Sequence, residues 1–192
     1  MSAGSGTGHP NDERAVLIRA LNGDADAFGN LYVLHLDAIY RYVYFRVGSQ
    51  EEAEDLTGEV FVRAWEALPS YQIGVFPFKS WLYRIAHNLV VDHRRKRRPL
   101  SLPDEGIAET PSPHIAPEDL VALRQDAAAL ASAVKDLDDE EQQVIILRFV
   151  EGLSHREVAD IIGKSEGASR VIQHRALGKL QGYLSSQKPS DE

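Results

Sequence analysis

Apolar residues recur every three to four positions through most of the chain, which is the period of an amphipathic helix. Capping residues and glycines divide this pattern into segments that start near positions 12, 26, 49 and 78 in the first half. In the second half, segments start near positions 117, 138, 154 and 165. The pattern therefore predicts an all-α protein.

Three of these starts carry a capping box, in which a Ser or Asp is followed three residues later by Glu. The pairs are Ser49 with Glu52, Asp138 with Glu141, and Ser154 with Glu157. Glycines at 23, 48, 152 and 163 end the helices that precede them. The predicted helix boundaries thus rest on cap chemistry as well as on periodicity.

The segment 78–98, FKSWLYRIAHNLVVDHRRKRR, is predicted to form one helix of about five turns between two prolines. Its apolar stripe includes Trp81, Ile85 and Leu89, which indicates that one side is buried. The other side carries cations and an amide, namely Lys79, Arg84, His87, Asn88, His93 and the run 94–98. Such a face suits phosphates and unstacked bases, but it equally suits a core helix whose basic end is solvated and complements the helix dipole.

The last two helices have the spacing of a helix-turn-helix, with a short helix from Ser154, a turn at Gly163 and a longer basic helix from Ser165. In that motif the start of the second helix approaches base edges. The residues concerned are Glu166, Ala168, Ser169, Arg170 and Gln173, with Lys164, His174 and Arg175 near phosphates. Plain helical bundles also contain such pairs, but the basic charge and small residues of the second helix favour DNA.

Between the two helical halves, residues 99–117 contain five prolines, scattered acids and no period, as expected of a flexible linker. We therefore expect two small helical domains, at 12–98 and 118–185, with a disordered Gly/Ser-rich leader at 1–11 and a tail at 186–192. Each domain is near the lower size limit for an independent core.

The net charge of -8 argues at first against a nucleic-acid partner. The charge is segregated, however, because acids gather at 51–59 and 104–119 whereas cations gather at 94–98 and 164–179. Local basic patches remain compatible with DNA binding on an acidic protein. Because the two candidate DNA-reading units are joined flexibly, we expect no stable sequence-specific DNA binding by the free chain.

The chain has no cysteine, which excludes disulfides, thiolate zinc sites and thiol catalysis. The paired carboxylates of 51–59 have no histidine at matching spacing, so we predict no catalytic group, metal or cofactor. No apolar run approaches the roughly 20 residues of a membrane span, and the N-terminus has no secretory signal pattern. We expect a cytoplasmic protein that is not an enzyme.

Three stretches resemble the extracytoplasmic-function (ECF, group 4) sigma factors of the bacterial sigma-70 family. Residues 53–68, AEDLTGEVFVRAWEAL, are similar to region 2.2, residues 78–98 to regions 2.3 and 2.4, and residues 137–180 to regions 4.1 and 4.2. The resemblance covers nearly the whole chain in the family's order. It implies a sigma factor that binds core RNA polymerase and directs promoter recognition and transcription initiation, without a cofactor, small-molecule substrate or membrane insertion. An anti-sigma factor partner is common in the family.

The resemblance also implies roles for individual residues. Those that would bind polymerase are Asp55, Leu56, Glu59 and Phe61. Those that would bind the -10 element are Ser70, Tyr71, Phe76, Lys79, Trp81, Arg84, Asn88, Arg94 and Arg95. Those that would bind the -35 element are Lys164, Ser169, Arg170, Val171, His174 and Arg175. Gly58, Ser169, Val171 and Ile172 depart from the usual family pattern.

Two other functions compete with this interpretation. One is a stand-alone helix-turn-helix transcription regulator, which would lack a counterpart of residues 53–98. The other is a metal-dependent nuclease that uses the acids of 51–59, and metal-dependent activity would identify it.

Overall fold

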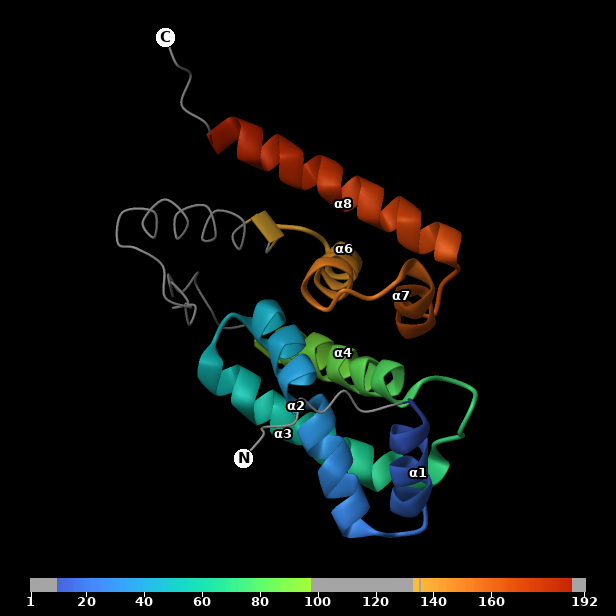
Figure 1. Cartoon of the computed structure of the whole chain (residues 1–192). Helices are drawn as coiled ribbons and strands as arrows, with labels where there is room; N and C mark the ends of the chain where they lie inside the picture. Colours follow the sequence, from blue (N-terminus) through green and yellow to red (C-terminus); the bar gives the residue numbers. More distant parts are fainter. Residues whose placement is uncertain (1–9, 98–132, 135, 188–192) are drawn as a thin grey trace, which may run out of the picture.

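The computed structural model describes residues 10–97, 133–134 and 136–187 (Figure 1). The regular elements of the first part are α1 Pro10–Leu21, α2 Ala25–Val47, α3 Gln50–Ala67, the 3-10 turn η1 Leu68–Ser70 and α4 Phe78–Arg97. Those of the second part are α6 Asp139–Ile145, the π-helical turn η2 Ile146–Val150, α7 His155–Ile162 and α8 Glu166–Gln187. All regular structure in these ranges is helical, which confirms the predicted fold class.

Two of the three predicted capping boxes are formed in full, at Asp138 and Ser154, each with the Glu three residues on. At the third site, Ser49 accepts a hydrogen bond from the backbone N–H of Glu52. Gly163 lies in the left-handed region with φ 69°, where a side chain would be strained, and its N–H is donated to the carbonyl of Ala159. The turn of the predicted helix-turn-helix is therefore set by local chemistry.

Several predicted boundaries differ from the observed ones. Helix α1 begins at Pro10, inside the segment expected to be a disordered leader, and α8 runs to Gln187, past the expected domain end at 185. The helix expected to run from Asp138 towards Gly152 changes to π-helix at Ile146. The expected linker 99–117 and the helix expected from 117, up to residue 132, lie outside the described residues.

Helices α1 to α4 form one bundle, in which α2 packs against α1, α3 and α4. The second unit lies on the side of that bundle formed by α4 and the C-terminal part of α2, with α6 and α7 between the bundle and the long helix α8 (Figure 1). The apolar core is continuous between the two units. It includes Tyr42, Leu82 and Val90 from the bundle and Val144, Leu147 and Val158 from the second unit.

A smaller apolar cluster joins α6 to α8 through Leu137, Ile145, Ala176 and Leu180. It fixes α8 on the far side of the second unit from α4. Within the part of the chain that the structure describes, no helix combines the length and the apolar character needed to cross a bilayer.

Candidate nucleic-acid interface

The loop that leads into α4 is held against the helix by aromatic contacts. The Tyr71 hydroxyl donates a 2.6 Å hydrogen bond to the carbonyl of Phe76, which closes the loop across Gly74 at φ 91°. The Tyr71 ring packs against Phe78 and Trp81, with centroid distances of 5.6 and 5.1 Å. Tyr71, Phe76 and Trp81 are thereby brought together at the N-terminal end of α4.

Helix α4 buries Leu82, Ala86 and Val90 and turns a polar face outward from the bundle. The Lys79 ammonium lies 5.7 Å from the Tyr83 ring centroid, and the Arg84 guanidinium stacks 3.8 Å from the ring centroid of Phe76. Near the end of the helix Arg95 is 77% exposed and pairs with Asp92 at 3.1 Å. Helical spacing therefore places Trp81, Arg84, Asn88 and Arg95 on one face of α4. Lys79 lies beside the buried Tyr83, and Arg94 faces the second unit.

Part of this surface faces the second unit instead of solvent. A cleft of about 470 Å³ separates α4 from α6 and the end of α7. Its lining is Arg84, His87 and Asn88 on α4 and Asp139, Glu140, Gln143, Ile161, Ile162 and Gly163 opposite. Burial lowers the pKa of His87, and the charge of Arg46 lowers it further, so its imidazole is neutral at pH 7.

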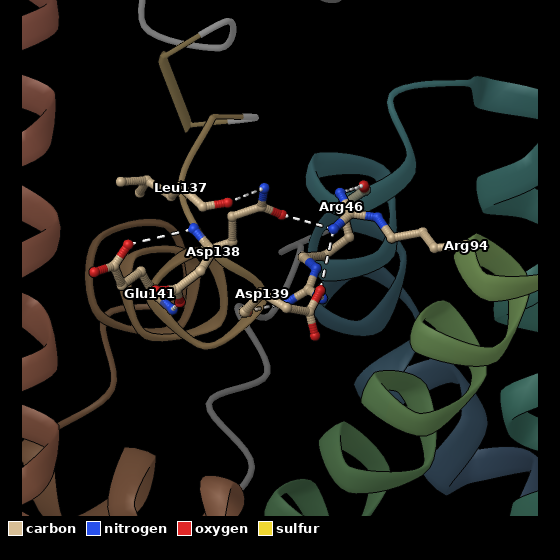
Figure 2. Close-up of polar contacts among 7 residues, drawn as sticks. Arg46, Arg94, Leu137, Asp138, Asp139 and Glu141 are labelled. Atoms are coloured by element: carbon tan, nitrogen blue, oxygen red, sulfur yellow. Dashed lines mark hydrogen bonds and ion pairs between the residues drawn. The ribbon is translucent and has the colours of Figure 1, made fainter. Parts of the chain in front are cut away.

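Two arginines from the bundle converge on the start of α6 (Figure 2). The completely buried Arg46 side chain pairs with the Asp139 carboxylate and donates to its backbone carbonyl at 3.2 Å. Arg94 donates to the same carboxylate at 3.1 Å, to the Gln142 amide oxygen at 2.9 Å and to the Arg46 carbonyl at 2.5 Å. A single carboxylate thus joins the ends of α2 and α4 to α6.

A second polar contact joins the two units at Glu151, just after η2. Its carboxylate is 1% exposed and accepts two hydrogen bonds from Arg41, each 3.1 Å long, and one of 2.8 Å from the Tyr83 hydroxyl. Burial strongly raises the pKa of Tyr83, and the Glu151 charge adds to the effect, so the phenol stays protonated as a donor.

Sequence reasoning did not single out Arg41, Arg46, Tyr83 or Glu151. Arg46 lies in the last turn of α2, where an arginine is normally solvated and stabilises the helix dipole. Its position in the sequence therefore gave no indication that it is buried.

Helix α8 presents most of the predicted -35 residues on one exposed face. Arg170 and Val171 are 61% and 59% exposed, and His174 and Arg175 are also exposed. Arg170 pairs with Glu166 one turn before it, and Lys164 lies 3.0 Å from Glu140. These are surface ion pairs, which phosphate or base contacts displace at small cost.

Ser169 lies elsewhere than the sequence analysis expected. It is fully buried, because Ser169, Ile172 and Ala176 form the stripe by which α8 packs on α6 and α7. Its hydroxyl shares a 3.0 Å hydrogen bond with Nδ1 of His155. Burial lowers the pKa of His155, as do the charges of Arg148 and Arg170. Ser169 thus faces the neighbouring helix, where DNA does not reach it.

Gln173 is also held from within the second unit. Its side-chain oxygen accepts a 3.1 Å hydrogen bond from Arg148, whose guanidinium also binds the Leu153 carbonyl. Its side chain therefore faces η2, away from the Arg170 and Val171 surface.

On α3 the predicted polymerase-binding residues fall into two groups. Asp55 and Glu59 are exposed, whereas Leu56 and Phe61 are only 6% and 4% exposed and belong to the core. Direct contact of Leu56 or Phe61 with a partner does not fit this burial. The exposed surface beside the acids instead includes Val62, which is 57% exposed and was not predicted. Across the described residues, no three His, Asp or Glu side chains gather in a way that could hold a metal ion.

Comparison with known proteins supports the same division of the chain. The family model "Sigma-70 region 2" matches residues 31–99, and "Sigma-70, region 4" matches residues 133–182. ECF RNA polymerase sigma factor BldN of Streptomyces coelicolor is 41% identical over 167 residues, which are 86% of this chain and 63% of BldN. ECF RNA polymerase sigma factor SigW of Bacillus subtilis is 32% identical over 84% of this chain and 91% of SigW.

Among solved structures, CnrH in complex with the cytosolic domain of CnrY matches with a TM-score of 0.71 and 28% identity, over 92% of this chain and 99% of the other. RpoE of Bartonella quintana, solved in complex with the anti-sigma factor NepR, matches with a TM-score of 0.66 and 23% identity, over 84% and 98% of the two chains. The second likeness concerns the fold alone. On these matches, the chain belongs to the ECF RNA polymerase sigma factors of the sigma-70 family.

Proposed function

We propose that the protein is a sigma factor that binds core RNA polymerase and directs recognition of the -10 and -35 promoter elements and transcription initiation. We call the α1 to α4 bundle region 2 and the α6 to α8 unit region 4. The observation that carries the proposal is the presence of two DNA-competent surfaces, one on α4 and its aromatic loop and one on α8, in the chain order of the family. Aromatic rings and arginines beside Asn88 suit unstacked bases, whereas the face of α8 suits a major groove.

The proposed DNA contacts are those that the resemblance implies, limited to side chains that are exposed or half-buried. On α4 and its loop, the proposed -10 contacts are Ser70, Tyr71, Phe76, Lys79, Trp81, Arg84, Asn88, Arg94 and Arg95. On α8 and the turn before it, the proposed -35 contacts are Lys164, Arg170, Val171, His174 and Arg175. On α3 the proposed polymerase contacts are Asp55 and Glu59, supported from beneath by Leu56 and Phe61.

We further propose that the protein has no enzymatic activity of its own and works in the cytoplasm with the polymerase. CnrH and RpoE of Bartonella quintana were each solved with a partner, the cytosolic domain of CnrY and the anti-sigma factor NepR. By analogy, an anti-sigma factor is the second proposed partner of this protein.

The test is transcription reconstituted from bacterial core RNA polymerase and the purified protein on a library of randomised promoters. We expect transcripts only when both are present, and enrichment of two sequence elements at a fixed spacing. Charge removal at Asp55 and Glu59 should weaken polymerase binding, whereas Asp37→Asn, at an exposed acid of α2, serves as the control. A free protein that binds duplex DNA tightly but supports no transcription would instead be a stand-alone helix-turn-helix regulator.

A further inference from the structure

Three of the residues proposed to bind the -10 element, Arg84, Asn88 and Arg94, lie on the part of α4 that faces region 4. Helix α4 packs against α7, and the cleft beside this contact has Arg84 and Asn88 on one wall and Asp139 and Glu140 on the other. A DNA strand laid along α4 would need the space that α6 and α7 fill.

The cations of this surface are already engaged. Arg84 donates to the backbone carbonyl of Asp160 in α7, and Arg94 donates to the Asp139 carboxylate and to the Gln142 amide oxygen in α6. A guanidinium has donors only, so the same N–H groups cannot bind a phosphate while they hold these oxygens. The Asp139 carboxylate therefore takes the place on Arg94 that a DNA phosphate would take.

Two buried charges hold region 4 in this position. Arg46 is completely buried only because α6 covers it and supplies Asp139, and Glu151 is buried among Arg41 and Tyr83 of region 2. Each charge has its strongest partners across the boundary between the regions, so these bonds exist only while the regions are packed together. Replacing Asp139 or Glu151 by its amide therefore weakens the boundary without substituting any proposed DNA-binding residue.

Region 4 covers part of α4 in region 2, but region 2 does not cover the proposed -35 residues of region 4. The proposed -35 side chains Arg170, Val171, His174 and Arg175 stay exposed on α8, which lies beyond α6 and α7 as seen from α4 (Figure 1). Region 4 thus occupies part of the -10 surface of region 2 while leaving its own reading helix accessible.

We propose that region 4 competes with single-stranded DNA for α4 within the same molecule. In the free protein Asp139 and Glu151 keep region 4 on the -10 surface, and a strand binds there only after region 4 has moved away. This inference deepens the proposed function and rests on it, because it concerns the regulation of the -10 site. It also gives a structural reason for the weak promoter binding that we expect of the free chain.

The first test measures binding of the full-length free protein to a fluorescent single-stranded oligodeoxynucleotide of randomised sequence. The double variant Asp139→Asn, Glu151→Gln should bind this probe about tenfold more tightly than the unaltered protein if the closed state outnumbers the open one by about ten to one. Glu140→Gln is the matched control, because Glu140 lies on the same helix and pairs with Lys164 of region 4. An equal gain in affinity for Glu140→Gln and for the double variant would mean that the loss of any acid near α4 strengthens DNA binding, and it would overturn the proposal.

Opening itself is measured separately. The natural chain has no cysteine, so spin labels at Val33→Cys on α2 and Leu177→Cys on α8, both exposed positions, report the distance between the regions. The double variant should broaden and lengthen this distance while circular dichroism keeps its helical signal. A longer distance with unchanged binding of the single-stranded probe would overturn the proposal, as would an unchanged distance.

A locked protein gives the opposite test without altering the ion pairs. Cysteines introduced at His87 and Ile162, which line opposite walls of the cleft, are joined by a bismaleimide, and protein carrying two monofunctional maleimides is the control. The locked protein should lose binding of the single-stranded probe and keep its low-salt binding of a double-stranded probe through α8. Equal single-strand binding by locked and control protein would overturn the proposal. Failure of the proposed function would appear differently, as absence of polymerase-dependent transcription.

Discussion

The hydroxyl of Tyr83 in region 2 donates a 2.8 Å hydrogen bond to the buried carboxylate of Glu151 in region 4. We expect Tyr83→Phe to lower the free energy of unfolding by about 1.5 to 3 kcal/mol, because a hydrogen bond to a buried charge is lost while the ring still packs. Urea denaturation followed by circular dichroism measures this. Tyr32→Phe, which removes the hydroxyl of an exposed tyrosine of α2, is the control and should change stability by less than about 0.5 kcal/mol.

The same contact predicts loss of stability at alkaline pH. The raised pKa of Tyr83 means that the folded protein keeps the phenolic proton more tightly than the unfolded chain. Its contribution is complete below the ordinary tyrosine pKa of about 10 and is lost as pH rises above that value. Stability measured from pH 8 to 11 should therefore fall more steeply in the unaltered protein than in Tyr83→Phe. Parallel curves would show that Tyr83 does not hold its proton in this way.

Most of the correct sequence-based predictions depend on interactions between residues that are close in the sequence. The boxes at Asp138 and Ser154 and the left-handed turn at Gly163 depend on residues within a few positions of one another, so the helices of region 4 could be placed from the sequence. The polar face of α4 could be predicted from the helical spacing of its residues. The role of Tyr83, which lies in the same helix, was not predicted.

The contacts between the regions could not be predicted in the same way. Arg46 and Asp139 are 93 residues apart, and Arg41 and Glu151 are 110 apart. Charged side chains are solvated in most proteins, and Arg46 and Glu151 are buried only because η2 packs on α2 and α7 packs on α4. The burial of Ser169 likewise depends on the rotation of α8 about its axis, which is set by Ile172 and Ala176 in the core.

Ser169 and His155 give a third prediction, which separates positioning from base contact. Because Ser169 is buried against His155, Ser169→Ala should lower the stability of region 4 by about 1 kcal/mol. It should weaken holoenzyme binding to matched and mismatched -35 sequences by the same factor. A selective loss on matched sequences would restore the direct DNA contact expected from the sequence. Ser185→Ala is the control, because Ser185 is exposed and bonds only within α8.

A fourth prediction concerns acid pH and helix α1. The hydrogen bond from His35 lowers the pKa of Glu13 below its ordinary 4.5, and the charges of His35 and Lys79 act in the same direction. A lowered carboxyl pKa stabilises the fold above the ordinary value, and this contribution is lost as pH falls through the lowered value. We expect hydrogen exchange in α1 to accelerate below about pH 4.5, and Glu13→Gln to exchange faster already at pH 6 with less further change. Identical pH profiles for both proteins would contradict the assignment.

The last prediction separates the two kinds of contact on α8. Arg170 lies in the second turn, where side chains of a recognition helix meet base edges, whereas Arg175 lies more than a turn later, where the phosphate backbone is close. Loss of a base contact narrows the difference between matched and mismatched sites by about 1 to 3 kcal/mol, whereas loss of a phosphate contact weakens all sites alike and lowers the salt slope by about one unit. Arg170→Ala should therefore relax specificity, and Arg175→Ala should flatten the salt dependence.

The measurement is holoenzyme binding, across a salt series, to the -35 sequence selected from the randomised promoters and to its mismatched versions. Arg19→Ala, at an exposed arginine of α1, serves as the control and should change neither quantity. A uniform loss in both α8 variants would mean that α8 enters the groove by a different face, with the exposed Val171 as the first residue to exchange.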